Sequence, residues 1–240
     1  MAIFQSSYMI NQSISEIKSQ ISNFSKLANR NESEISLLAI SKTFSSEFVE
    51  EAFNSGIPDF GENYVQELLD KKTKLQHLKI NWHFVGHLQS NKVKFIAPFV
   101  EIIHSVDSKK IAEEIDFRAK KENRKIKILI EVNTSDEKSK FGVKPNCAIN
   151  FISEISHLKN IQINGLMTIG PFTDNPENSR PAFKKLRALM DEANNLKLTT
   201  EPLIHLSMGM SHDFKIAIEE GATILRIGTA IFGKRTKKDV

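Results

Sequence analysis

Short apolar runs alternate with longer amphipathic segments along the 240 residues of this chain. Eight of the runs have the length and the β-branched or aromatic content of buried strands. They begin at Ile35, Pro58, Trp82, Glu101, Ile126, Ile161, Leu203 and Thr223. The run at Pro58, PDFG, is short for a strand. Strands that alternate with helices predict a parallel sheet.

The segments between the runs carry apolar residues at helical spacing, and most of them end in Gly, Asn or Pro. They predict helices over residues 47–54, 62–75, 108–121, 146–157, 180–195 and 212–220. Ile14, Ile17, Ile21 and Phe24 recur at the same spacing before the first strand. This pattern predicts an extra N-terminal helix over residues 7–30.

Eight strand–helix units predict an α/β fold, a single closed (β/α)8 TIM barrel over residues 35–233. Such barrels commonly use about 250 residues as one domain, so we expect residues 1–240 to form a single domain with a basic tail over 234–240. An open doubly wound sheet is the alternative. The glycine fingerprint expected after its first strand is absent from AISKTFSSEF, residues 39–48.

The composition is that of a soluble globular protein, with 40% hydrophobic and 26% charged residues. No apolar run approaches the roughly 20 residues of a membrane-spanning helix. The N-terminal residues lack a basic segment followed by an apolar one, so no secretory signal is predicted. Cys147 is the single cysteine and cannot form an internal disulfide. We therefore expect a cytoplasmic protein that makes no membrane contact.

The net charge of +4 raises the question of nucleic acid. No aromatic-basic motif accompanies the lysines, so a solvated surface is the preferred interpretation and no nucleic-acid partner is expected. His83 and His205 lie within predicted strands and are expected to line the barrel. No cluster of carboxylates completes a metal site with His83 and His87, and no metal is expected.

The functional site of such a barrel forms at the C-terminal ends of its strands. The segments after the seventh and eighth predicted strands, SMGMS and GTAIFG, combine hydroxyls with glycines. Ser207 and Thr229 supply hydroxyls, while Gly209 and Gly228 let backbone N–H groups approach an anion. Phosphate sites in these barrels commonly use those two loops, so the pair predicts a phosphate site.

The run LLAISKTF places Lys42 directly after the first predicted strand. Desolvation at the rim of a largely apolar barrel lowers the pKa of a lysine amine, which can then attack an aldehyde to form a Schiff base. The alternative is a strand end that leaves its ammonium group in water. The neighbouring phosphate site favours the first interpretation of Lys42.

Several motifs together resemble one family. They are AISKTF, DFGENYVQELLDK, WHFVGHLQSNK, HSVDS, EVNTSDEKSKFGV, INGLMTIGPF, LSMGMSHDF and RIGTAIFG, in this order from Ile35 to Gly233. The chain resembles the pyridoxal phosphate homeostasis protein family. The resemblance implies a barrel of the alanine racemase N-terminal domain type that binds pyridoxal 5′-phosphate (PLP).

The resemblance also implies the residues that hold PLP. It implies a Schiff base on Lys42 and places Arg226 near the pyridine nitrogen. The implied cofactor-binding residues are Lys42, Asn63, Met167, Ser207, Met208, Gly209, Arg226, Gly228 and Thr229. Because an arginine stays protonated, it would leave the ring nitrogen neutral and weaken PLP as an electron sink.

The resemblance implies a role in intracellular PLP (vitamin B6) homeostasis, with no catalytic residues. Racemases of this fold add a β domain and a tyrosine base from a partner subunit, and we expect neither here. Tyr64 is expected to be a wall or structural residue. The family implies a monomer, and an open cofactor face would suit delivery of PLP to apo PLP-dependent enzymes.

Two alternative functions stay open at this point. A small amino-acid racemase would place solvent deuterium at the α-position of an amino acid. A phosphosugar barrel with an aldolase-like Schiff base would explain Lys42 and the phosphate site, but it leaves Arg226 without a specific role.

Overall fold

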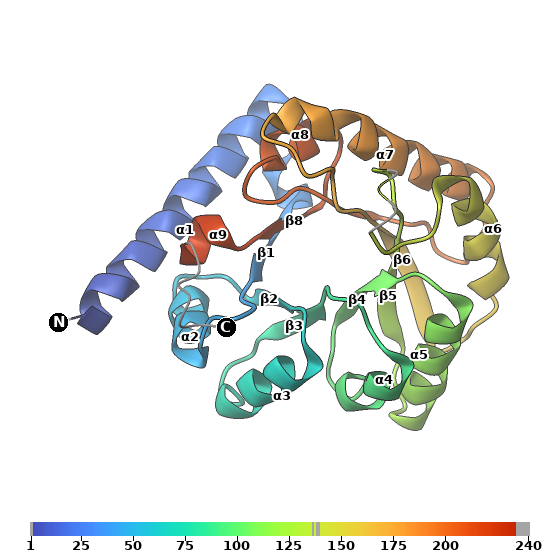
Figure 1. The fold of residues 1–240 in the computed structure, drawn as a ribbon, viewed down its shortest axis with the longest axis horizontal. Helices are drawn as coiled ribbons and strands as arrows, with labels where there is room; N and C mark the ends of the chain where they lie inside the picture. Colours follow the sequence, from blue (N-terminus) through green and yellow to red (C-terminus); the bar gives the residue numbers. More distant parts are fainter. Residues whose placement is uncertain (1, 136, 138–139, 234–240) are drawn as a thin grey trace.

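Eight parallel strands close into a barrel in sequence order (Figure 1). The computed structural model describes residues 2–135, 137 and 140–233, so the predicted basic tail over 234–240 lies outside the described residues. The strands are β1 (Ser36–Ile40), β2 (Asp59–Glu62), β3 (Asn81–Phe84), β4 (Ile102–Val106), β5 (Ile126–Glu131), β6 (Ile161–Met167), β7 (His205–Ser207) and β8 (Ile224–Ile227). The predicted closed barrel is confirmed, including the short strand after Pro58.

Helices surround the strands on the outside of the barrel (Figure 1). They are α1 (Ala2–Leu27), α2 (Ser46–Asn54), α3 (Val65–Lys74), α4 (Ser90–Ile96), α5 (Lys109–Lys121), α6 (Pro145–Ile155), α7 (Arg180–Asn195), α8 (Phe214–Glu219) and α9 (Thr229–Phe232). Two 3-10 turns, Glu32–Glu34 and Pro176–Ser179, precede β1 and α7.

The sequence pattern misplaced some helix boundaries. The helix expected from residue 62 begins at Val65, because Glu62 still pairs with Phe84 in the sheet. The pattern missed α4 and α9, which are short helices of seven and four residues inside polar or glycine-bounded segments. The N-terminal helix, expected over residues 7–30, already ends at Leu27, because Asn29 takes a left-handed φ of 53°.

Strand alternation divides the side chains between two regions. One face of each strand packs against the helices and forms the main core, with β1 contributing Ala39 and β3 contributing Phe84. The other face points into the barrel, where a small apolar layer is built from Leu38, Ile102, Leu129, Met167 and Ile224. Polar side chains on the same inward faces lie toward the candidate site described below.

The long helix α1 packs against α2, α8 and α9, so it joins elements from both ends of the chain (Figure 1). Its buried stripe consists of Ile10, Ile14, Ile17 and Ile21. Three of these isoleucines belong to the spacing that predicted a helix before the first strand, so the sequence identified the buried face correctly.

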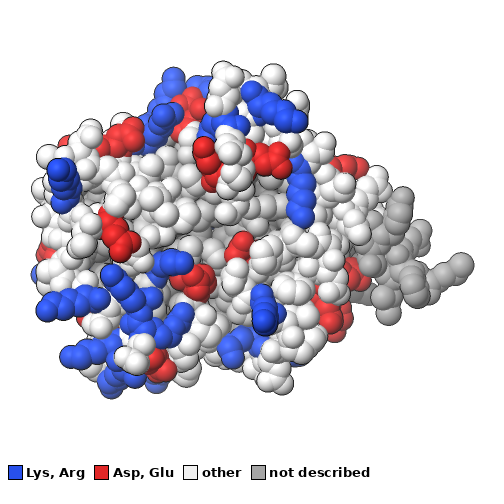
Figure 2. All heavy atoms as spheres, turned by 180° about the vertical axis from the view of Figure 1, so that it is seen from behind, with Lys and Arg blue, Asp and Glu red and all other residues white. Residues whose placement is uncertain are grey.

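Charged side chains are mixed over the surface. Figure 2 shows Lys and Arg gathered at the lower left, on the side where α4 and α5 lie. Several cations of this region have acidic partners, as in the pairs Arg118–Glu114 and Lys109–Glu154, at 2.7 and 3.0 Å. Such pairs are typical of a solvated surface. Within the described part of the chain, every helix is too short or too polar to cross a membrane.

Candidate functional site

A cavity of about 330 Å³ lies at the C-terminal ends of the strands. Its walls come from the ends of β1, β2, β3, β6 and β8, and the loop after β7 completes them. The residues that line it are Ile40, Lys42, Phe44, Asn63, Val85, Met167, Ile169, Met210, Ser211, His212, Arg226, Gly228 and Thr229. The fold thus brings Lys42, Asn63, Met167, Arg226, Gly228 and Thr229 from the predicted site together around one space.

The β7 segment contributes differently from the prediction. Ser207, Met208 and Gly209 are absent from the cavity lining in the described structure, and Ser207 and Met208 are fully buried. Met208 packs in the main core. The next residues, Ser211 and His212, line the cavity instead. The sequence offered a signal for Ser211, because it is the second hydroxyl of the SMGMS segment.

Arg226 is held from beneath the cavity. Its Nη1 atom donates to the Ser207 carbonyl at 2.6 Å and to Ser207 Oγ at 2.8 Å. Its Nη2 atom donates to the Thr168 carbonyl at 2.8 Å. Burial lowers the pKa of Arg226 to about 10, and the carboxylates of Asp213 and Glu131 oppose this shift. The guanidinium is therefore still protonated at neutral pH.

Ser207 links Arg226 to a pair of buried histidines. His104 Nδ1 lies 3.0 Å from Ser207 Oγ, and His104 Nε2 lies 2.9 Å from His83 Nδ1. His83 Nε2 in turn lies 3.5 Å from a carboxylate oxygen of Asp59. His83 was expected to line the barrel from its place in a predicted strand, whereas no role was predicted for His104, which lies in the predicted strand from Glu101.

One order of donors and acceptors satisfies every contact of this chain with both histidines neutral. In this order Ser207 Oγ accepts from Arg226, which can only donate, and the Ser207 hydroxyl donates its own proton to His104 Nδ1. His104 then carries its proton on Nε2 and donates to His83, whose own Nε2–H faces Asp59. Burial first, and then nearby positive charge, holds the pKa of His104 well below its usual range. His104 is thus neutral, as this order requires.

Asn63 brings an unsatisfied group to the cavity. Its Oδ1 atom is buried and has no hydrogen-bond partner among the described residues. Gly86 allows the backbone of Asn63 to sit here, because a Cβ on Gly86 would overlap the Asn63 carbonyl group. A buried acceptor without a partner costs about 1–3 kcal/mol, so a ligand that donates a hydrogen bond to it would gain affinity.

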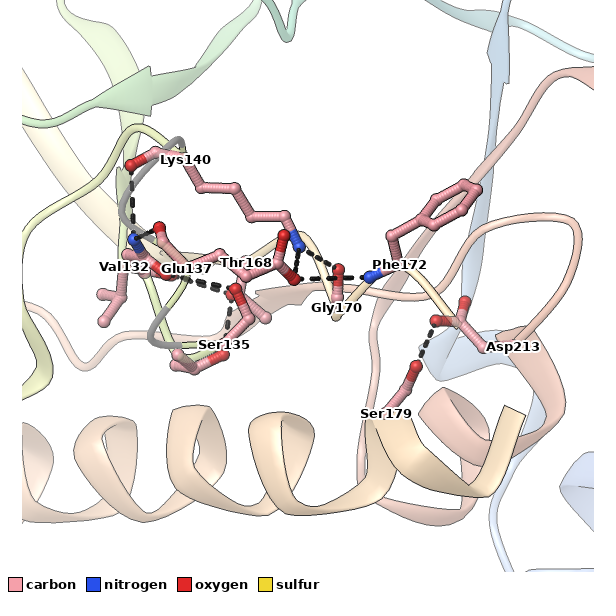
Figure 3. A network of polar contacts seen from close by, with 11 residues as sticks. Val132, Ser135, Glu137, Lys140, Thr168, Gly170, Phe172, Ser179 and Asp213 are labelled. Carbon is pink, nitrogen blue, oxygen red and sulfur yellow. Dashed lines mark hydrogen bonds and ion pairs between the residues drawn. The ribbon is translucent and has the colours of Figure 1, made fainter. Parts of the chain in front are cut away.

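A polar network connects the loops beside the cavity (Figure 3). Lys140 Nζ donates to the Gly170 carbonyl and to Glu137 Oε1, both at 2.7 Å. Asp213 accepts from Ser179 Oγ at 2.8 Å and from the backbone N–H of Met210 at 2.7 Å. Because Met210 lines the cavity, its bond to Asp213 fixes that part of the wall, and the bond between Asp213 and Ser179 joins the loop after β7 to the segment before α7.

Glu131 gives the site a pH-dependent contribution to stability. Burial raises its pKa from 4.5 to about 7, with a smaller contribution from Asp107, while Arg226 opposes the shift. Between these pH values the folded chain retains a proton that the unfolded chain has released. The free energy of unfolding therefore falls as the pH rises through this window.

The Glu131→Gln variant should not show this fall in the free energy of unfolding, because glutamine does not titrate. We expect its free energy of unfolding, relative to the wild type, to rise by about 1–3 kcal/mol between pH 4.5 and 7. Urea denaturation at several pH values measures the difference. Glu113→Gln, which alters an exposed carboxyl on α5, serves as the control. A constant difference between Glu131→Gln and the wild type across this window would contradict the assignment.

Known proteins share the sequence motifs and the fold of this chain. Residues 14–236 match the family described as alanine racemase, N-terminal domain. The structure of PipY from Synechococcus elongatus PCC7942 with PLP bound gives a TM-score of 0.82 at 32% identity, covering 93% of this chain and 100% of that one. An alanine racemase from Clostridium difficile 630, at 15% identity and a TM-score of 0.71, shares the fold, and the match covers 93% of this chain and 58% of the racemase.

The closed barrel thus has the fold of an alanine racemase N-terminal domain. The pyridoxal phosphate homeostasis protein of Aquifex aeolicus is 46% identical to this chain over 222 residues, which are 92% of this chain and 96% of its own. The human protein of the same name is 40% identical over 209 residues, 83% of this chain and 76% of its own. The chain belongs to the pyridoxal phosphate homeostasis protein family, as the sequence motifs predicted.

Proposed function

We propose that this chain binds PLP in the cavity beside Lys42 and serves intracellular PLP homeostasis. The observation that carries the proposal is the placement of Lys42, Arg226 and Thr229 on one cavity. The cavity volume lies in the range of small-molecule sites. Two relatives support the proposal, because PipY was solved with PLP bound and the Aquifex protein is named for PLP homeostasis.

The chemistry of the cavity wall fits PLP. Gly228, Thr229 and Ser211 would hold the phosphate through a backbone N–H and two hydroxyls. Ile40 and Val85 offer apolar surface for the ring, and the unsatisfied Oδ1 of Asn63 would accept a hydrogen bond from the ligand. We propose that Met167 contacts the ring, and that Ser207, Met208 and Gly209 support the phosphate loop from behind.

Lys42 and Arg226 would hold the two reactive positions of PLP. When bound, PLP supplies an electrophilic aldehyde and an electron-withdrawing pyridine ring. The Lys42 amine would bond covalently to the aldehyde carbon, and the aldehyde oxygen would leave as water. The bonds of Arg226 to Ser207 and Thr168 use three of its five N–H groups, and we propose that another of them faces the ring nitrogen.

We propose that the chain turns over no substrate. A guanidinium beside the ring nitrogen keeps that nitrogen neutral and limits the stabilisation of a carbanion. One observation favours the racemase alternative, because His212 lines the cavity and is a second base besides Lys42. Solvent deuterium that enters the α-position of alanine at a catalytic rate would establish that alternative.

Three further aspects belong to the same proposal. We propose a cytoplasmic protein that acts as a monomer, with residues 1–240 forming one domain. The match to the Aquifex relative covers 96% of that protein. We also propose that the chain transfers PLP from its cavity to apo PLP-dependent enzymes. Apo-enzymes should then gain PLP faster from the loaded chain than from free PLP at its equilibrium concentration.

Borohydride reduction tests the PLP site directly. Protein purified in the presence of PLP is reduced, digested and searched for phosphopyridoxyl peptides by mass spectrometry. We expect the label on Lys42 alone, because the other described lysines lie outside the cavity lining. Labels spread over surface lysines, or no label, would overturn the proposal and leave the phosphosugar barrel to be tested next.

A further inference from the structure

A buried lysine lies directly behind Lys42. Lys71, on α3, has a side chain that is 5% exposed, and its ammonium contacts Glu62 Oε1 at 2.6 Å and Glu67 Oε1 at 2.7 Å. The side chain of Glu62 is fully buried at the end of β2, on the strand face that points to the helices. None of these three residues lines the Lys42 cavity in the described structure.

This cluster holds both peptide groups that flank Lys42. Lys71 Nζ donates to the Ser41 carbonyl at 2.6 Å, which fixes the peptide before Lys42. The Thr43 backbone N–H donates to Glu67 Oε1 at 2.5 Å, which fixes the peptide after it. The Ser41 hydroxyl also donates to Glu62 Oε1 at 2.6 Å. One cluster of side chains thus sets the backbone on either side of the cavity lysine.

The backbone at Thr43 needs such support. Its φ is 69°, a left-handed value that is an outlier for a β-branched residue. A residue held in this region costs about 1–3 kcal/mol and persists only where its surroundings determine it. The turn formed by Lys42 and Thr43 lies between β1 and α2. Release of the Thr43 N–H from Glu67 would allow the backbone to return to a relaxed conformation.

Stability alone does not account for the buried ions. Taking Lys71 and Glu62 out of water costs several kcal/mol per ion, and well-packed apolar residues of similar volume are often as stable or more stable. The pKa of Glu62 reflects this cost, because burial raises it to about 7 despite the nearby ammonium. A charged pair does supply directed hydrogen bonds to fixed backbone atoms, which an apolar pair cannot supply.

We propose that Lys71 is a positioning residue, which with Glu62 and Glu67 holds the Ser41–Lys42–Thr43 backbone so that the Lys42 amine is presented to the cavity. The inference rests on the proposed function, since the amine it positions is the proposed PLP-binding group. It assigns a role to the β2–α3 motif GENYVQELLDK, of which only Asn63 belongs to the predicted site.

The test compares Lys71→Met with Lys74→Met, which changes an exposed lysine on the same helix. We expect Lys71→Met to slow the borohydride-trapped attachment of PLP to Lys42 by about 10- to 100-fold, because small displacements of a reacting group carry such costs. Lys74→Met should match the wild type. Lys71→Arg, which keeps the charge and the donors, should recover part of the rate.

A second readout needs no PLP. Hydrogen exchange of the Thr43 amide, followed by NMR, reports whether its bond to Glu67 persists. We expect exchange about 10-fold faster in Lys71→Met than in Lys74→Met, while amides of the barrel core stay protected. Attachment to Lys42 within twofold of the wild type in folded Lys71→Met would overturn the proposal. Unchanged protection of the Thr43 amide would overturn it too.

A second variant covers the case in which Lys71→Met fails to fold. The double variant Glu62→Gln with Lys71→Met removes both buried charges and leaves neither unpaired, and the same slow attachment to Lys42 is expected. Failure of the proposed function has a different signature. The wild type itself would then carry no label on Lys42, and the exchange of the Thr43 amide would decide whether Lys71 holds the backbone.

Discussion

Lys42→Ala should eliminate the borohydride-stable label and weaken PLP binding by about 100-fold, or about 2.7 kcal/mol. The loss arises because the covalent bond to the aldehyde disappears. Ser211, Gly228 and Thr229 would remain to bind the phosphate, so binding should become reversible and weaker rather than vanish. Absorbance titration with PLP measures the affinity, and mass spectrometry after reduction measures the label.

Lys74→Ala provides the control for this change, because it removes an exposed lysine far along α3 from the cavity. Its label and its affinity for PLP should equal those of the wild type. A reduced adduct that persists at wild-type yield in Lys42→Ala would show that another lysine binds the aldehyde, and it would remove Lys42 from the mechanism.

Gly209→Ala should destabilise the fold by about 2–5 kcal/mol. Gly209 has a φ of 90°, which L side chains rarely adopt, and an added Cβ would lie 2.5 Å from the Cβ of Ala217. The Gly209 carbonyl also accepts the backbone N–H of Arg226 at 2.9 Å, so a shift would disturb the strand that carries the guanidinium. Chemical denaturation measures the change in the free energy of unfolding.

The Gly221→Ala variant separates the cost of the positive φ from the cost of the contact with Ala217. Gly221 has a similar φ of 98°, but an added Cβ would meet only the flexible Arg187 side chain at an ordinary 3.5 Å. This variant should therefore lose only the conformational part, about 1–2 kcal/mol. Equal losses in Gly209→Ala and Gly221→Ala would show that the contact with Ala217 relaxes without cost.

The barrel was predictable because each strand is a local pattern. Runs such as IKILIEVN are buried on both faces, and their order along the chain is also their order in the sheet. The short strand β2 was recognisable from its place between two clear units. The helices α4 and α9 were not predictable, because tertiary packing rather than a long apolar period sets such short helices.

The sequence predicted residues that line the cavity, such as Lys42 and Thr229, but not the buried side chains behind them. Lys42 and Thr229 follow strands, so the rule for barrel strand ends located them. His104 and Lys71 escaped notice because their importance depends on partners distant in the sequence, Ser207 in one case and the Ser41 carbonyl in the other. A polar residue inside an apolar run shows its type, but the pattern does not show which atom it contacts.

The packing of α1 has a consequence for synthesis on the ribosome. This helix is made before the strands of the barrel, yet two of the three helices that cover it, α8 and α9, are among the last segments of the barrel to be made. Until they emerge, the stripe of Ile10, Ile14, Ile17 and Ile21 is only partly covered by α2. Strand β1 pairs with β8, so the barrel cannot close before β8 has been made. The nascent chain therefore carries apolar surface for most of its translation, which is the state that chaperones bind.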